Sequence, residues 1–156
     1  MPIKFKLWHS FVGLGVLLVL QTIALYTLPG LALAWLTLLC AATGAIGLLY
    51  VSTEVIEEVR NARRMLILLS VVMIEFVVFF ACEYWFLVTV SSTAYPSLPH
   101  DAVSMLLHST MVFVFNPLYL PTNGLGQLLL IINTLSALGL VLFILQNVWQ
   151  FRREKI

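Results

Sequence analysis

The chain has 156 residues, of which 62% are hydrophobic and only 10% are charged, and its net charge is +1. Soluble domains average about 45–50% apolar and about 25% charged residues, so this composition excludes an ordinary soluble domain. No basic, aromatic-rich stretch is present in the sequence, which argues against a nucleic-acid-binding protein. The sequence predicts an integral membrane protein that is embedded in the lipid bilayer.

Four apolar runs are long enough to cross a bilayer, because a helix needs about 20 residues to span a core of about 30 Å. The first run is long and lacks a small-residue cleavage site, so we expect it to be a retained span. Pro29-Gly30 separates the first two runs and favours a helical hairpin. In chain order the predicted transmembrane helices cover residues 7–28, 31–52, 65–90 and 125–149.

The basic residues predict the orientation of these spans. With four crossings, all of them fall on one side of the membrane, which the positive-inside rule makes cytoplasmic. We therefore expect a multi-pass protein of the cell (inner) membrane, with both termini in the cytoplasm. The eight basic residues form three clusters: Lys4 and Lys6; Arg60, Arg63 and Arg64; and Arg152, Arg153 and Lys155.

The connector at residues 53–64 has apolar residues at helical spacing, so we expect a neighbouring helix to continue through it. Two interpretations of its Arg60, Arg63 and Arg64 stay open. They either lie on a solvated elbow and fix the topology, or they bind a cytosolic protein or anionic lipid headgroups. We divide the chain into residues 1–64, with two helices and this connector, and residues 65–156.

The segment from Asp101 to Leu120 is apolar but broken. A fifth crossing here would place the C-terminal basic cluster outside, and Pro117 and Pro121 would interrupt helical hydrogen bonds. We therefore expect a re-entrant segment between the third and fourth spans. A short helix would start at Asp101, whose carboxylate suits a helix N-terminus, and end near Met111 before an extended return over residues 113–120.

The order of helix, re-entrant helix, extended segment and helix resembles the pore module of tetrameric potassium channels over about residues 66–148. Residues 121–127, P-T-N-G-L-G-Q, are similar to the P-T-x-x-L-G-K of that family, and Asp101-Ala102 and Gly139 also match. Small bacterial members with two extra N-terminal spans share this plan. The resemblance implies a homotetramer in which the third span is the outer helix and the fourth lines the conduit.

The sequence departs from the family at the selectivity filter. A gap-free overlay sets Met111–Asn116 on T-V-G-Y-G-D, with Phe113 and Phe115 in place of both glycines. Glycine adopts positive φ far more readily than phenylalanine, so the familiar carbonyl filter is not expected. In an extended strand the two phenylalanines project to one side: facing the axis they form a hydrophobic constriction, and facing the protein they leave it lined by valine or closed. The predicted pore or filter residues are Thr110, Met111, Val112, Phe113, Val114, Phe115 and Asn116.

Other polar and small residues within the spans are also candidates. The last span carries a group that serves either helix packing or a pore lining with a hinge. Intramembrane ionisable residues are functional candidates because a charge there is costly. We hypothesise a contact between Glu83 and His108, because their predicted depths in the membrane match; the alternative is that each carboxyl is neutral and bonded to a neighbouring hydroxyl or backbone group. These candidates are Asn133, Ser136, Ala137 and Gly139 in the last span, and the ionisable Glu75, Glu83 and His108.

The sequence contains no catalytic motif and no metal-ligand spacing, so we expect neither an enzyme nor a cofactor. The leading hypothesis is a cation channel with an atypical, hydrophobic filter that is not classically potassium-selective. The alternative is a non-conducting sensor or anchor that uses the channel fold and signals through residues 53–64 to a cytosolic protein.

Overall fold

The computed structural model describes residues 3–58 and 62–153. All regular structure in these residues is helical, as the composition predicted. Residues 1–2, 59–61 and 154–156 lie outside the described part, and with them the predictions for Arg60 and Lys155. The five helices are α1 (Ile3–Thr27), α2 (Gly30–Glu58), α3 (Ala62–Val90), α4 (Ala102–Phe113) and α5 (Gly124–Arg153).

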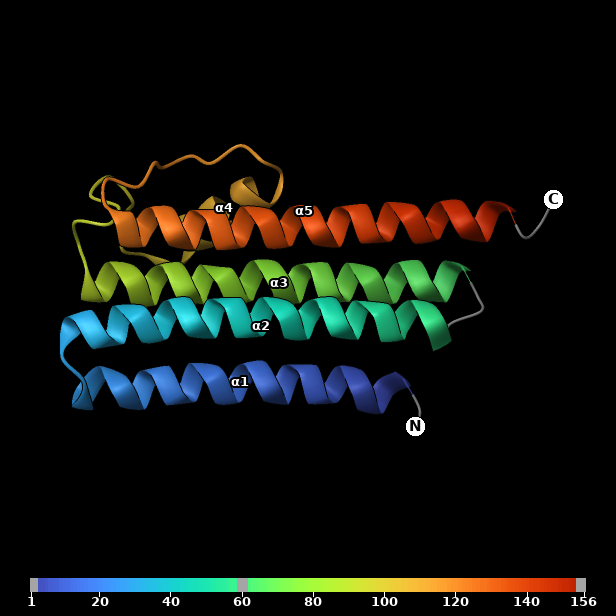
Figure 1. Cartoon of the computed structure of the whole chain (residues 1–156), viewed down its shortest axis with the longest axis horizontal. Helices are drawn as coiled ribbons and strands as arrows, with labels where there is room; N and C mark the ends of the chain where they lie inside the picture. Colours follow the sequence, from blue (N-terminus) through green and yellow to red (C-terminus); the bar gives the residue numbers. More distant parts are fainter. Residues whose placement is uncertain (1–2, 59–61, 154–156) are drawn as a thin grey trace.

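Four of these helices lie alongside one another (Figure 1). The start of α1, the end of α5 and the facing ends of α2 and α3 all lie at one end of the bundle (Figure 1). The turn at Pro29, the end of α3 and the start of α5 lie at the other, which we call the loop end. The chain therefore passes along the bundle four times, and α1 begins and α5 ends opposite the loop end.

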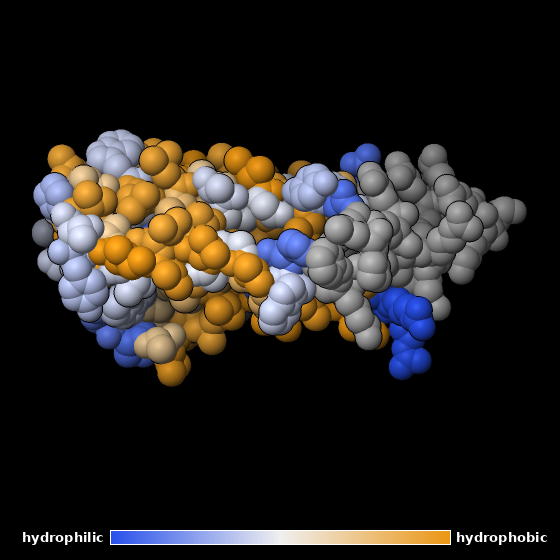
Figure 2. Space-filling view, turned by 90° about the horizontal axis from the view of Figure 1, so that it is seen from below, coloured by the Kyte–Doolittle hydropathy of each residue, from blue (hydrophilic) through white to orange (hydrophobic). Residues whose placement is uncertain are grey.

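The long helices match the predicted spans. Within the described residues, four helices are long and apolar enough to cross a membrane: Trp8–Thr27, Gly30–Glu54, Arg63–Val90 and Gly124–Gln146. Figure 2 shows the face on the side of α1, where hydrophobic side chains cover much of the surface and hydrophilic ones gather toward the ends. Val16, Val19 and Ile23 are more than half exposed on this helix. Such a surface suits a lipid environment and would be an aggregation liability in water.

The core lies where α2, α3 and α5 meet. Phe76, Phe79 and Phe80 of α3 are buried there, and the rings of Phe76 and Phe80 lie 4.7 Å apart. Gly44 of α2 allows the approach, because a Cβ atom on it would come within 2.3 Å of the Phe79 ring. Small residues permit such close helix packing in membranes, where hydrophobic burial does not drive association.

Helix α4 begins at the loop end and ends beside the middle of α3. Its N-cap is Asp101, whose carboxylate accepts a hydrogen bond from the Ser104 N–H at 2.9 Å, as the predicted helix start requires. Near its other end, the Ser109 hydroxyl donates to the Val77 carbonyl at 2.8 Å. The chain then returns to the loop end, where the Thr122 N–H donates to the Ala94 carbonyl at 3.0 Å.

The predicted extended strand over residues 113–120 does not begin at Phe113, which is instead the last residue of α4. The Phe115 N–H donates to the Val112 carbonyl at 2.9 Å, and the Asn116 N–H donates to the Met111 carbonyl at 2.8 Å. These two bonds form a Schellman motif, in which the residue at the position of Phe115 takes a left-handed conformation. Its φ is indeed 61°. The helix continues past Met111 because these bonds satisfy its last carbonyl groups.

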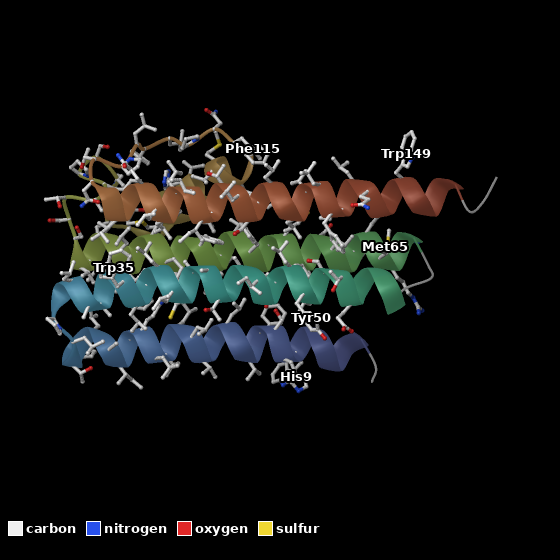
Figure 3. The ribbon with its side chains drawn as sticks, in the orientation of Figure 1. His9, Trp35, Tyr50, Met65, Phe115 and Trp149 are labelled. Atoms are coloured by element: carbon white, nitrogen blue, oxygen red, sulfur yellow. The ribbon has the colours of Figure 1, made fainter. Side chains whose placement is uncertain are left out.

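The two phenylalanines consequently do not share one side of a strand. Phe113 is 8% exposed, and its ring packs edge-on against Phe76 of α3 with the ring centres 5.5 Å apart. Phe115 is 47% exposed and lies at the margin of the molecule, where the chain leaves α4 (Figure 3). Phe113 therefore belongs to the core, and only Phe115 is presented outward.

Candidate functional site

A cluster of aromatic rings holds α4 and the segment after it against α3. His108 of α4 is fully buried, and the rings of Tyr84, Tyr95 and Tyr119 surround it with centres 4.6, 5.5 and 5.6 Å away. Both of its ring nitrogens lack a hydrogen-bond partner. The three tyrosines come from α3, from the segment before α4 and from the segment after it. His108 therefore contacts α3, the segment that precedes α4 and the segment that follows α4.

Tyr95 connects this cluster to the start of α5. Its hydroxyl donates to the Gly126 carbonyl at 2.9 Å. Burial raises the pKa of the Tyr95 phenol, so it remains a protonated donor. Gly126, the second glycine of the P-T-N-G-L-G-Q motif, packs so closely that a Cβ atom there would lie 2.8 Å from Pro121 Cβ and 3.0 Å from the Ala94 oxygen. The motif therefore has a structural role in this chain: its Gly126 lets Ala94, Tyr95 and Pro121 pack closely against the start of α5.

Asn123 also joins the start of α5 to the residues that follow α3. Its side-chain oxygen accepts from the Gly126 N–H at 2.9 Å, which caps α5. Its amide nitrogen donates to the hydroxyls of Ser91 at 3.2 Å and Thr93 at 3.3 Å, just after the end of α3. One side chain thus fixes the beginning of α5 relative to the end of α3. Ser91 and Thr93 were not singled out from the sequence, because neither forms a recognisable motif.

Some of the predicted filter residues are buried in the bundle, and others are exposed at its surface. Val112 and Phe113 are buried, and Met111 is half-buried. The Thr110 hydroxyl donates to the Leu106 carbonyl within α4 itself. The outward-facing members of the predicted set are Thr110, Val114, Phe115 and Asn116.

The residues predicted to line a pore on the last span mostly face inward. Asn133 and Ala137 are fully buried within the chain, and the Asn133 amide donates to the Tyr84 hydroxyl at 3.2 Å. A Cβ atom on Gly139 would face Leu49 of α2 at 4.0 Å, and Ser136 is half-buried. Of the two roles left open by the sequence, packing accounts for the burial of Asn133 and Ala137. The outward face of α5 is instead apolar and includes Ile131, Leu135, Leu138, Leu142 and Leu145.

The two intramembrane glutamates are bonded to α1. The Ser10 hydroxyl donates to Glu75 at 2.9 Å, and the Gln21 amide donates to both oxygens of Glu83 at 2.9 Å. The hypothesised contact between Glu83 and His108 does not form a hydrogen bond, since both nitrogens of His108 are without a partner. Sequence reasoning missed both α1 partners, although they are polar residues within an otherwise apolar run.

Of the three arginines predicted to contact a partner or lipid, Arg60 is outside the described residues, and Arg63 and Arg64 lie at the end opposite the loops. Arg63 and Arg64 have exposed side chains in the first turn of α3. No group of three or more His, Cys, Asp or Glu side chains that could hold a metal ion occurs among the residues that the structure describes. Comparisons with models of protein families, with characterised proteins and with solved structures find no match to this chain.

Proposed function

We propose that the chain is one subunit of a homotetrameric pore in the inner membrane that conducts cations, with α4, the segment after it and α5 arranged around the axis. The observation that carries the proposal is the path of α4. It runs from the loop end to Val77, near the middle of α3, and the chain then returns to Ala94 at the loop end. In a membrane crossed by the long helices, this path would make α4 and residues 114–123 a re-entrant segment.

The return segment leaves irregular backbone at a depth where the long helices are surrounded by lipid. Backbone without regular hydrogen bonds is tolerated there only when protein buries it or water lines it. In a single chain, Val114, Phe115, Leu118 and Leu120 are all more than 40% exposed. Other copies of the chain, arranged around a shared axis, would bury part of this backbone and enclose a water-filled space beside the rest. Closed symmetric assembly is the common form of soluble homo-oligomers, and the family resemblance selects four copies.

The direction of α4 favours cations at this axis. Its C-terminal end, which carries the negative end of the helix dipole, points toward the middle of the bundle. The carbonyls of Met111 and Val112 accept the N–H groups of residues 115 and 116 in the Schellman motif and do not project from an extended strand, as the carbonyls of the familiar filter do. The proposed constriction is therefore hydrophobic, with Phe115 at its narrowest ring, and it conducts when it is wetted.

The orientation follows from the charge distribution. In the sequence the three basic clusters occur at or beside the start of α1, the start of α3 and the end of α5, and the end of the bundle that these share would face the cytoplasm by the positive-inside rule. The re-entrant segment would then open to the outside. Arg63 and Arg64 would lie at the cytoplasmic surface, where anionic lipid headgroups are within reach.

Recordings from purified protein in planar bilayers test the proposal. We expect discrete cation-selective openings, and a higher conductance for Phe115→Ala because the smaller side chain widens the constriction. Phe11→Ala is the matched control, since Phe11 is a phenylalanine of similar exposure, 49%, on α1. Bilayers that stay silent, or the same change of conductance in both variants, would refute the pore. Silent bilayers together with a cytosolic protein that co-purifies through residues 53–64 would instead favour a non-conducting sensor or anchor.

A further inference from the structure

The interior of the bundle holds an acid and an amide that face each other. Glu83 of α3 and Gln21 of α1 are both fully buried. The Gln21 nitrogen lies 2.9 Å from each oxygen of the Glu83 carboxyl. The Gln21 oxygen, in contrast, has no hydrogen-bond partner. Buried polar atoms normally have partners, so an unpaired oxygen beside a carboxyl indicates that a hydrogen atom is to be supplied there.

The groups around Glu83 provide no positive charge. α1 presents the neutral Gln21, and α2 presents the Cys40 thiol. The Cys82 thiol is next to Glu83 on α3 itself, and His108 of α4 is directed at tyrosine rings instead. α5 contains no titratable residue between Gly124 and Phe151. No Lys or Arg occurs at residues 7–59 or 65–151, and burying an ionised carboxylate without a partner is strongly unfavourable.

A proton on Glu83 removes the buried negative charge and also supplies a hydrogen atom for the Gln21 oxygen. An amide has nearly the same shape when its oxygen and nitrogen exchange places, so the Gln21 side chain fits equally well when turned over. In that orientation the Gln21 oxygen takes the position 2.9 Å from both Glu83 oxygens, and a protonated Glu83 donates its O–H to it. The result is an acid–amide hydrogen bond with no buried charge and no unpaired Gln21 oxygen.

We propose that Glu83 and Gln21 form an intramembrane proton-binding site, whose ligand is a single proton held at neutral pH. The site links α1 to α3 in a part of the bundle where α1 otherwise presents mainly apolar side chains to the surroundings. Ser10 and Glu75 form a second polar link between the same two helices. That pair has only one hydrogen bond, which leaves one Glu75 oxygen unpaired. The Glu83 site does not depend on ion conduction, so its test is independent of the test of the pore.

Infrared difference spectroscopy on the full chain in lipid bilayers tests the site, because a protonated carboxyl absorbs at higher frequency than a carboxylate. Subtracting the spectrum of Glu83→Gln from that of the parent protein at pH 7 is expected to leave a protonated-acid band that shifts in deuterated water. Asp101→Asn is the control: Asp101 is exposed, so its difference spectrum should show a carboxylate at the same pH. A carboxylate band for Glu83 at pH 7 would overturn the proposal.

Gln21→Leu provides a second measurement that retains the acid. This variant removes the acceptor of the Glu83 O–H, so the protonated-acid band should move to higher frequency while it keeps its intensity. A band that does not move would show that Gln21 is not the partner of the proton, and this result would also refute the site. Because Glu83→Gln preserves the size of the side chain and Gln21→Leu preserves the glutamate, the two variants perturb the packing in different ways.

Discussion

Replacing Phe115 by glycine is expected to give a more stable protein than replacing it by alanine. Both substitutions remove the same partly exposed ring, and they differ only in the Cβ atom. Phe115 has a φ of 61°, in the left-handed region, where a Cβ atom costs roughly 1–2 kcal/mol. The greater freedom of glycine in the unfolded chain offsets roughly 0.5–1 kcal/mol of this difference. The net expectation is that the free energy of unfolding of Phe115→Gly exceeds that of Phe115→Ala by about 0.5–1 kcal/mol, or about two- to fivefold in the unfolding equilibrium.

Unfolding of the purified protein in mixed micelles by a denaturing detergent, followed by tryptophan fluorescence, measures this difference. The same pair of substitutions at Phe11 is the control, since Phe11 lies in the interior of α1. There the sign should reverse, with glycine about 1 kcal/mol worse than alanine because of its lower helix propensity. If the alanine variant at position 115 is as stable as the glycine variant, the left-handed cap at the end of α4 does not exist as described.

Two further substitutions test other parts of the fold. Gly44→Ala should destabilise the same unfolding equilibrium by about 1–3 kcal/mol, because its Cβ atom would meet Phe79, whereas Gly47→Ala, with no atom within 4 Å, should be neutral or slightly stabilising. Equal effects of the two would refute the close packing of α2 on α3. Asp101→Asn addresses acid sensitivity: hydrogen bonds from Ser104 hold the pKa of the Asp101 carboxyl below its usual value. A lowered folded-state pKa stabilises the fold above the unfolded value of about 3.9, and this stabilisation is lost as the pH falls through the folded value. Unfolding measured from pH 6 to pH 2 should therefore depend less on acid in Asp101→Asn, and an unchanged pH dependence would refute the cap.

The four long helices could be predicted from the sequence because length and hydropathy are properties of each segment alone. The start of α4 at Asp101 was also predictable, since an N-cap is a local hydrogen bond between the aspartate side chain and the Ser104 N–H. The end of α4 was not. It depends on the Schellman motif, which normally contains glycine at the position that Phe115 occupies.

The partners of the intramembrane glutamates lay beyond prediction for a different reason. The hydropathy of a transmembrane run sets its depth, but it does not set the rotation of one helix relative to another. Glu83 and His108 were paired by depth, yet Glu83 faces α1 and binds Gln21. His108 faces tyrosines of α3 and of both segments that flank α4. Only the packing of whole helices decides between such alternatives.

The attachment of Asn123 has a mechanical consequence for α5. This side chain caps the helix and donates hydrogen bonds to Ser91 and Thr93, while the Tyr95 hydroxyl donates to the Gly126 carbonyl. The start of α5 is therefore attached to the residues that follow α3, and further along the helix Leu140 lies in the core and Ile144 packs against Met65 and Leu69. Any displacement of residues 91–95 should consequently move the start of α5 with it.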